Sequence, residues 1–226
     1  MRVNKKQLSI GVIALGTILT GGLISGTTPY ASEKVTSLVY NLSEECIVRK
    51  EEKKLIMIDP GHGGYDAGAV NPITGDREAQ YNMEIALKVK HKLELEGYQV
   101  VLTRYYHREF YEIYERVNMG NTGDHVFFLS IHNNATKSHK GTGTETFYNG
   151  YGNAKDIAVK MSQNIANNIN SINRGAKETP YFNYNIKKPS VLVECEFIDN
   201  AEGLDKIKNK QEEIAKGIVD GLLEYL

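Results

Sequence analysis

Short apolar runs alternate with longer amphipathic stripes from residue 55 to the end of the chain. A short run closed by turn residues is typical of a buried strand, and an apolar stripe at helical spacing is typical of a helix. The pattern predicts strands over residues 55–59, 98–102, 126–130, 142–148 and 190–194, and helices over residues 78–96, 110–121, 153–172 and 211–225. This alternation predicts an α/β fold: a single domain with a central, largely parallel twisted sheet of about five to six strands flanked by helices.

The N-terminal segment has a different pattern. Three basic residues precede an apolar run over residues 8–24, and no acidic residue appears before Glu33. This order is typical of an export signal, and the length of the run also suits an N-terminal membrane anchor. Both interpretations place the rest of the chain outside the cytoplasm, where it is secreted, associated with the cell wall or anchored to the membrane. We therefore expect a signal peptide or anchor over residues 1–31, a linker over residues 32–54 and the folded domain over residues 55–226.

Composition and charge narrow the class of protein. Of the 226 residues, 41% are hydrophobic and 24% are charged, which argues against intrinsic disorder. The formal net charge of −1 argues against a nucleic-acid partner held by bulk electrostatics. The two cysteines cannot form a disulfide framework. We interpret Cys195, which lies in an apolar run, as an inert buried thiol, and we disfavour a bridge to Cys46 in the linker.

Residues capable of chemistry follow the predicted strands. His62 comes shortly after the first strand, His132 after the third, and Glu194 ends the fifth. Open parallel sheets place ligands beyond the carboxyl ends of their strands, so we expect these side chains to lie at one edge of the sheet. Taken alone, each histidine is more often a loop or strand-end residue that packs and forms hydrogen bonds.

Glu78 is the third member of this set. It extends the buried stripe of its predicted helix, which continues through Asn82, Ala86, Val89 and Leu93. A glutamate there either complements the helix dipole from the first turn or points inward as a ligand. Two imidazoles and one carboxylate match the donor set of a catalytic zinc ion, which leaves a fourth position for water.

Glu194 supplies the proton acceptor that a zinc hydrolase needs. The alternative is a strand-end glutamate that faces solvent. Glu196 has the same parity along the strand, so the sequence pattern does not separate the two interpretations.

Several short motifs follow one another in a fixed order along the domain, and together they are more specific than any one of them. They are Ile58-Asp59-Pro60-Gly61-His62-Gly63-Gly64, Glu78 with Asn82, Leu102-Thr103-Arg104, Arg116, Ser130-Ile131-His132-Asn133-Asn134-Ala135, Gly143-Thr144-Glu145-Thr146-Phe147 and Pro189-Ser190-Val191-Leu192-Val193-Glu194. From Leu55 to Leu226 this order resembles the zinc-dependent N-acetylmuramoyl-L-alanine amidases of the type-3 family.

The resemblance implies specific roles. His62, Glu78 and His132 would bind one zinc ion (Zn2+) in the domain, and Glu194 would be the catalytic carboxylate. The substrate would be peptidoglycan, and the bond cleaved would join the lactyl group of N-acetylmuramic acid to L-alanine of the stem peptide. The sequence does not identify a protein activator.

The chain departs from the family pattern after the catalytic glutamate. Glu196 and Phe197 stand where family members usually carry Gly-Phe, and Asp199 stands where a small polar residue is common. Glu196 would face away from the metal, contact substrate or repel the charge of Glu194. Asn134 would bind the substrate amide or cap its own loop.

We expect two arginines and the other histidines to have structural or surface roles. We expect Arg104 and Arg116 to form structural ion pairs rather than to bind stem-peptide carboxylates. The remaining histidines have no partners at metal-site positions, and we interpret them as surface residues; they are His91, His107, His125 and His139.

Two alternatives to the amidase stay open. One is a non-catalytic or partner-dependent peptidoglycan-binding protein that keeps the fold and the zinc. The other is a zinc-dependent stem-peptide carboxypeptidase. The sequence also leaves open whether the setting is the spore cortex, cell separation or autolysis.

Overall fold

The structure is a computed structural model that describes residues 53–179 and 181–226. The predicted signal peptide or anchor, Cys46 and most of the predicted linker lie outside the described residues. Within the described residues, no helix is both long and apolar enough to cross a membrane.

The domain is built on a six-stranded sheet with the order β2-β1-β3-β6-β4-β5. All neighbouring pairs are parallel except β4 and β6, which are antiparallel, so the prediction of a largely parallel sheet is confirmed. The strands are β1 Leu55–Pro60, β2 Gln99–Leu102, β3 Phe127–Asn134, β4 Thr144–Tyr148, β5 Asn173–Glu178 and β6 Ser190–Phe197.

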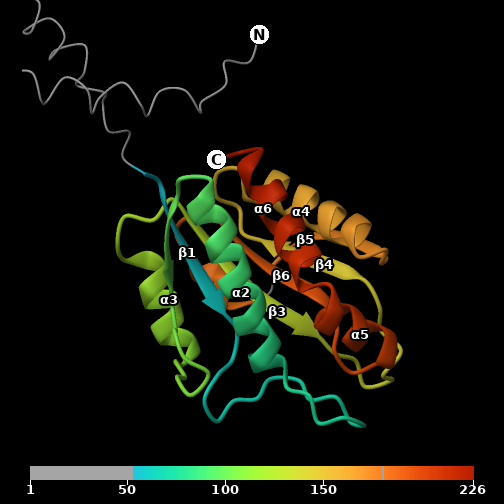
Figure 1. Ribbon diagram of the computed structural model, residues 1–226. Helices are drawn as coiled ribbons and strands as arrows, with labels where there is room; N and C mark the ends of the chain where they lie inside the picture. Colours follow the sequence, from blue (N-terminus) through green and yellow to red (C-terminus); the bar gives the residue numbers. More distant parts are fainter. Residues whose placement is uncertain (1–52, 180) are drawn as a thin grey trace, which may run out of the picture. The chain divides into compact units, whose positions relative to one another are not determined.

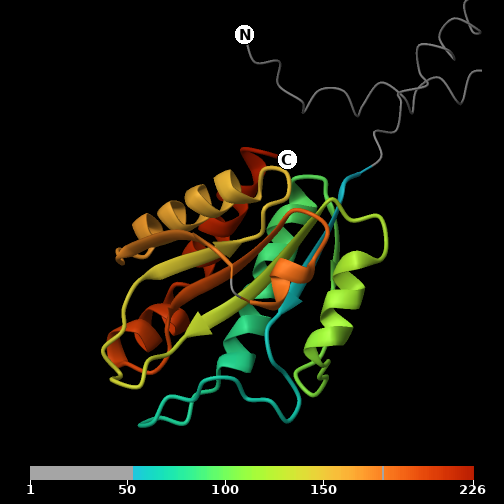
Figure 2. The same cartoon turned by 180° about the vertical axis from the view of Figure 1, so that it is seen from behind.

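Helices cover both faces of this sheet. Figure 1 shows α2, α4 and α6 on one face, and Figure 2 shows α3 and the short 3-10 helix η2 on the other. α5 follows β6 directly along the chain. The helices are α2 Glu78–Leu95, α3 Ile113–Asn121, α4 Ala154–Asn168, η2 Phe182–Asn185, α5 Ala201–Asn209 and α6 Gln211–Leu223.

Alternation along β3 and β6 separates the apolar core from the polar residues of interest. Side chains at successive strand positions point to opposite faces of a sheet. Leu129 and Ile131 belong to the buried core with residues of α2, α4 and α6, so His132 points the other way. Val193 and Cys195 belong to the same core, so Glu194 shares the face of His132. The buried, free thiol of Cys195 matches the prediction of an inert core cysteine.

Three elements were missed by the sequence pattern. The pattern predicts one strand and one helix between residues 135 and 189, but the structure adds β5 and η2 there. β5 is polar because it is an edge strand paired only with β4. The third missed element is α5, a short helix whose N-cap residue, Asn200, accepts a side-chain hydrogen bond from Gly203 N.

Candidate active site

The carboxyl ends of β1, β3 and β6 bring the predicted residues to one place. These three strands are parallel neighbours, so their ends meet at one edge of the sheet. His62 follows β1 by two residues, and His132 is paired in register with Glu194 across β3 and β6. The sheet alone therefore sets three of the four predicted residues side by side.

Close backbone approach holds the two imidazoles together. His62 adopts a positive φ of 60°, and its ring lies edge-to-face with the ring of His132 at a centroid distance of 4.9 Å. A Cβ at Gly61 would lie 2.6 Å from His132 Nδ1. A Cβ at Gly68 would lie 2.6 Å from both Glu78 Oε2 and His62 Cδ2. Only glycine leaves room for the rings and the carboxylate at these two positions.

Glu78 joins the two histidines. It is the first residue of α2, only 4% exposed, and its stripe faces the sheet as predicted. Its Oε2 lies 3.2 Å from His62 Nε2, and its Oε1 lies 2.9 Å from His132 Nδ1. One candidate ligand atom from each of the three residues lies within 4.8 Å of the others. Asp66 Oδ2, 2.7 Å from His62 Nδ1, fixes the orientation of that ring from outside.

Two orphaned atoms test whether this cluster suits a metal. His132 Nε2 and Glu194 Oε2 are buried and have no hydrogen-bond partner among the described residues. Buried polar atoms are normally satisfied, so the site is built for a group that the protein chain does not supply. Two imidazoles and a carboxylate are the donors that zinc accepts at a catalytic site. The residues present therefore fit a zinc ion.

The charges in the cluster point the same way. Burial would raise the pKa of Glu78, but its contacts with His132 and His62 outweigh burial and lower that pKa. Burial, and then the charges of Glu78 and Glu145, raise the pKa of Glu194 well above its usual range. Two other carboxylates thus lie near Glu194, while no cation among the described residues is bonded to Glu194 Oε2. A bound metal cation would supply the missing positive charge.

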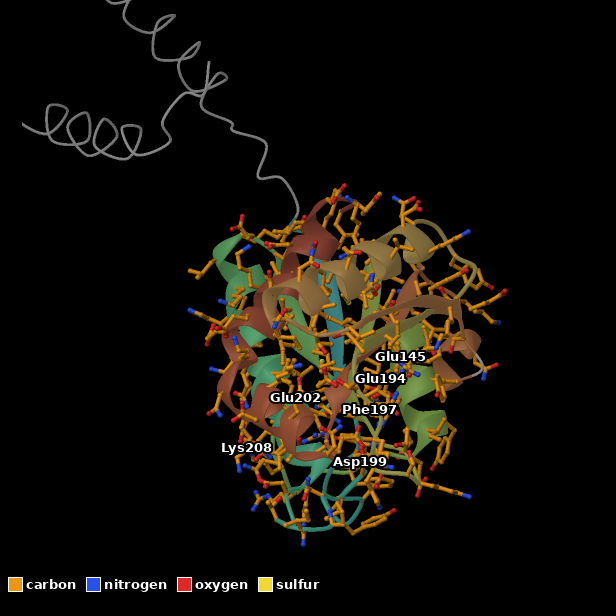
Figure 3. The ribbon with its side chains drawn as sticks, turned by 90° about the vertical axis from the view of Figure 1, so that its right-hand side faces the viewer. Glu145, Glu194, Phe197, Asp199, Glu202 and Lys208 are labelled. Carbon is orange, nitrogen blue, oxygen red and sulfur yellow. The ribbon has the colours of Figure 1, made fainter. Side chains whose placement is uncertain are left out.

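A fourth carboxylate, that of Glu145, lies beside the cluster and was not among the predicted site residues. Glu145 of β4 is paired in antiparallel register with Glu194 of β6, and Figure 3 shows the two side by side. Glu145 Oε1 accepts a hydrogen bond of 2.6 Å from Asn134 Nδ2, and Asn134 Oδ1 accepts one from Ala135 N. Asn134 therefore caps its own loop, which was one of its two predicted roles. The other oxygen of Glu145 contacts two cations of β5, Lys177 and Arg174.

Glu196 and Asp199 serve the loops around the site. The carboxylate of Glu196 is buried and accepts hydrogen bonds from Gly143 N, Phe197 N and the Ser171 hydroxyl. These hydrogen-bond partners lie within the fold, and none of them is a candidate metal ligand. Asp199 Oδ2 accepts a hydrogen bond from Thr136 N.

The two predicted structural arginines differ. Arg116 forms the expected ion pair, 3.8 Å from Asp59 Oδ2. Arg104 is buried, but its guanidinium donates to backbone carbonyls, including those of Pro60 and Gly61, instead of forming an ion pair. Burial lowers the pKa of Arg104 to about 10. Both side chains hold the loop that carries His62, because Arg116 Nη2 donates to the His62 carbonyl.

The prediction of four surface histidines is wrong for one of them. His125 is only 2% exposed, and its Nε2 lies 3.0 Å from the carbonyl oxygen of Gly120 in α3. Its ring lies near that of Phe128 of β3, so His125 lies on the face of the sheet that α3 covers. The other three are exposed as predicted; they are His91, His107 and His139.

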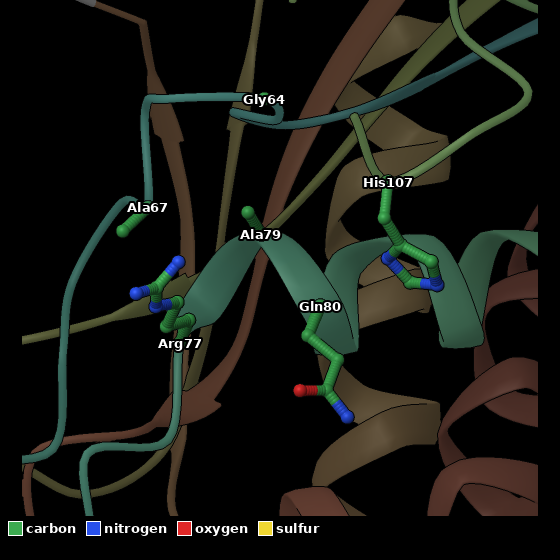
Figure 4. A pocket seen from close by; sticks show the side chains of 6 residues that line it. All are labelled: Gly64, Ala67, Arg77, Ala79, Gln80 and His107. Atoms are coloured by element: carbon green, nitrogen blue, oxygen red, sulfur yellow. The ribbon is translucent and has the colours of Figure 1, made fainter. Parts of the chain in front are cut away.

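A surface pocket of about 380 Å³ lies close to the start of α2. Figure 4 shows its lining residues, among them Arg77, Gln80 and His107. Arg77 and Gln80 flank the helix turn that carries Glu78, but none of the predicted site residues lines the pocket. The pocket is therefore separate from the cluster of His62, Glu78 and His132.

The sequence of the described domain matches a known protein family. Residues 56–224 match the family model described as N-acetylmuramoyl-L-alanine amidase. The chain belongs to this family. The family match covers the whole described amidase domain except its ends.

Individual proteins similar to this chain are also named as N-acetylmuramoyl-L-alanine amidases. The chain is 35% identical over 230 residues to the N-acetylmuramoyl-L-alanine amidase LytC of Bacillus subtilis, covering 98% of this chain and 44% of LytC. It therefore spans less than half the length of that relative. It is 31% identical over 191 residues to the germination-specific N-acetylmuramoyl-L-alanine amidase of Bacillus subtilis, covering 76% of this chain and 79% of the relative.

A solved structure confirms the fold of the amidase domain. The crystal structure of N-acetylmuramoyl-L-alanine amidase from Clostridium difficile 630 superposes with a TM-score of 0.73 at 30% identity. The match covers 77% of this chain and 97% of that one. The α/β fold with its mostly parallel sheet is thus that of solved amidases.

Proposed function

We propose that this chain hydrolyses the amide bond between N-acetylmuramic acid and L-alanine of the stem peptide in peptidoglycan, with one zinc ion as its resident cofactor. Membership of the amidase family supports the reaction class. The observation that carries the proposal is the convergence of His62, Glu78 and His132 beside Glu194. All three candidate ligands and the carboxylate come from separate segments of the chain, so a purely local structural role does not account for their meeting.

His62, Glu78 and His132 would hold the zinc ion. When bound, zinc supplies a Lewis acid that polarises a carbonyl and makes a water molecule more acidic. Asp66 and the loop glycines keep the ring of His62 in place, and Glu78 is anchored by the backbone N–H groups of Ala69 and Asn133. The protein thus keeps the donor set rigid.

Glu194 is the proton carrier in this proposal. Its carboxylate accepts a proton from the attacking water and then gives a proton to the alanine nitrogen as the amide bond breaks. The products are the lactyl carboxylic acid on the sugar and the free amine of the peptide. Burial is the first cause of the raised pKa of Glu194, and a carboxylate with a raised pKa is a stronger base than an ordinary one.

The location belongs to the proposal as well. We assign residues 1–31 to an export signal or anchor and residues 32–54 to a linker, so that the amidase domain acts outside the cytoplasm on the cell wall. The relative named a germination-specific amidase supports a role in germination, and a relative named a probable cell wall amidase supports a role at the cell wall.

The test uses the full chain with zinc on intact peptidoglycan. New alanine amino groups and new reducing sugar ends are measured in parallel, with Glu194→Gln as the control. Alanine amines without reducing ends, lost in the variant and after chelation, are the expected result. Release of single terminal amino acids would instead indicate a carboxypeptidase. Binding of peptidoglycan without release would indicate a binding protein or an enzyme that needs a partner.

A further inference from the structure

Two cations of β5 lie beside the candidate active site. The Lys177 ammonium forms an ion pair with Glu145 Oε2, and Arg174 Nε lies 3.3 Å from the same oxygen. Glu145 in turn is the register partner of Glu194 on β6. The two cations are therefore one residue removed from the carboxylate proposed to carry the proton.

The two cations share one carboxylate oxygen. Both contact the same oxygen of Glu145, and its other oxygen accepts a hydrogen bond from the amide of Asn134. In the described part of the chain, no hydrogen bond or ion pair joins either cation to Glu194. The ammonium and guanidinium groups carry more N–H donors than one oxygen can accept, so donors remain for a second carboxylate.

Both cationic side chains are accessible and are held in place. The side chain of Lys177 is 47% exposed and that of Arg174 is 39% exposed, so each can meet a ligand from solvent. The Lys177 ammonium lies 5.6 Å from the ring centre of Phe147, and the Arg174 guanidinium lies 5.2 Å from that of Phe197. Cation–π contacts of this kind restrict long side chains and lower the entropy lost on binding.

Open space lies beside β5 at Gly175. Gly175 and Ala176 separate the two cations along β5, and Gly175 is the register partner of Glu145. Apart from the two chain neighbours of Gly175, no atom lies within 4 Å of the position that a Cβ would occupy there. The surface next to Glu145 is therefore bare backbone with open space above it.

We propose that Arg174 and Lys177 bind a carboxylate of the stem peptide next to the alanine whose bond is cleaved. This inference rests on the proposed function. In peptidoglycan the residue after alanine is a glutamate linked through its side-chain carboxyl, so its α-carboxyl group is either free or amidated. A free carboxylate can accept charge-assisted hydrogen bonds from both cationic groups, whereas an amide carries no negative charge for them to pair with. The two cations thus select for the free acid one residue beyond the scissile bond.

The test compares two muropeptides that differ only at this α-carboxyl group. The zinc-loaded full chain should cleave the free-acid form with a kcat/KM about tenfold or more above that of the amidated form, because hydrogen bonds to charged groups are among the stronger ones. Lys177→Met and Arg174→Gln should reduce this ratio toward one, mainly through KM on the free acid. The matched control is Lys160→Met, which removes a lysine of α4 with a similar side-chain exposure of 43%; its partner is Glu224, directly after the end of α6, and not Glu145. The ratio should not change in this control.

Binding supplies a readout that does not need turnover. Both muropeptides are titrated into the Glu194→Gln variant by calorimetry, alone and combined with Lys177→Met. The free acid should bind more tightly, and the added substitution should abolish that difference. Equal binding of the two forms overturns the carboxylate site, as does a Lys177→Met variant that keeps the full preference. If the wild-type chain cleaves neither form yet still prefers the free acid in binding, the proposed hydrolysis fails while the carboxylate site stands.

Discussion

His132 and Glu194 occupy paired positions on the neighbouring parallel strands β3 and β6. Each also has a buried polar atom without a hydrogen-bond partner among the described residues. Paired strand positions lie about 5 Å apart in a sheet, so a metal ligand and a proton carrier there are held at a separation that neither loop motion nor helix shifts can change. The geometry of the proposed reaction is thus a property of the sheet.

Glu194→Gln tests the proton carrier. The amide cannot accept the proton, so kcat should fall by about a hundred- to ten-thousand-fold. Zinc content should remain unchanged, because Glu194 is not one of the three candidate ligands. Amine release and metal content measured on the same sample separate the two effects.

The control for this substitution is Glu202→Gln. Glu202 lies on α5 and pairs with Lys206 on the surface. It should keep wild-type activity. A Glu194→Gln variant that retains a tenth or so of the wild-type kcat would exclude Glu194 as the general base.

Asp66→Asn tests the support of the His62 ring. Asp66 Oδ2 lies 2.7 Å from His62 Nδ1, and carboxylates in this position orient a ligand and raise its basicity. The variant should bind zinc about 10- to 100-fold more weakly, as measured by competition with a chelator. Asp76→Asn, which changes a carboxylate bonded to Tyr81 and Lys208, is the control. Equal zinc affinities for the two variants would remove Asp66 from the metal site.

Gly61→Ala tests the close packing of the rings. The new methyl group would lie 2.6 Å from His132 Nδ1, and the buried ring has to move. We expect a loss of about 1–3 kcal/mol in unfolding free energy, together with loss of zinc binding. Denaturant unfolding with and without zinc measures both.

Gly150→Ala is the matched substitution. A Cβ at Gly150 meets no atom within 4 Å, and its backbone is not in the left-handed region. Stability should stay within about 0.5 kcal/mol of wild type. If Gly61→Ala proves equally harmless, the fixed placement of His132 is wrong.

Much of this site could be predicted from the sequence because its residues lie at the ends of strands and on the inner face of one helix, and both kinds of element leave clear apolar patterns. Apolar runs predicted the strands that His62 and His132 follow and the strand that Glu194 ends, and the stripe of α2 predicted that Glu78 points inward. Strand ends of a parallel sheet meet at one edge, so four residues spread over the chain could be grouped before any coordinates were known.

The missed part of the site has a physical reason. β5 carries Arg174 and Lys177 but reads Asn-Arg-Gly-Ala-Lys-Glu, without an apolar run. An edge strand buries little side-chain surface, so hydrophobic periodicity does not reveal it. Glu145 could be noticed in its motif, but its partners become visible only when β4 and β5 are placed side by side. Likewise, strand parity alone could not distinguish Glu194 from Glu196. Only the three-dimensional contacts separate them, because the carboxylate of Glu196 accepts a hydrogen bond from Gly143 N.

The ion-pair group around Glu145 predicts a pH dependence of stability. Burial would raise the pKa of Glu145, but Lys177 and Arg174 outweigh burial and lower it below the ordinary value of 4.5. A carboxyl group with a lowered pKa in the folded state stabilises the fold fully above its unfolded pKa, and this contribution is lost as the pH falls through the folded pKa. The stability difference between wild type and Glu145→Gln should therefore be constant above pH 4.5 and shrink below it.

Screening by solvent keeps the stability difference between wild type and Glu145→Gln small. The heads of Lys177 and Arg174 are half-exposed, so we expect about 1 kcal/mol at neutral pH. Denaturant unfolding of the zinc-free proteins over a pH series measures it. The control is Glu178→Gln at the exposed end of β5, whose side chain has no hydrogen bond or ion pair within the described residues. A difference for Glu145→Gln that grows as the pH falls would mean that Glu145 is protonated in the fold, which would contradict its pairing with both cations.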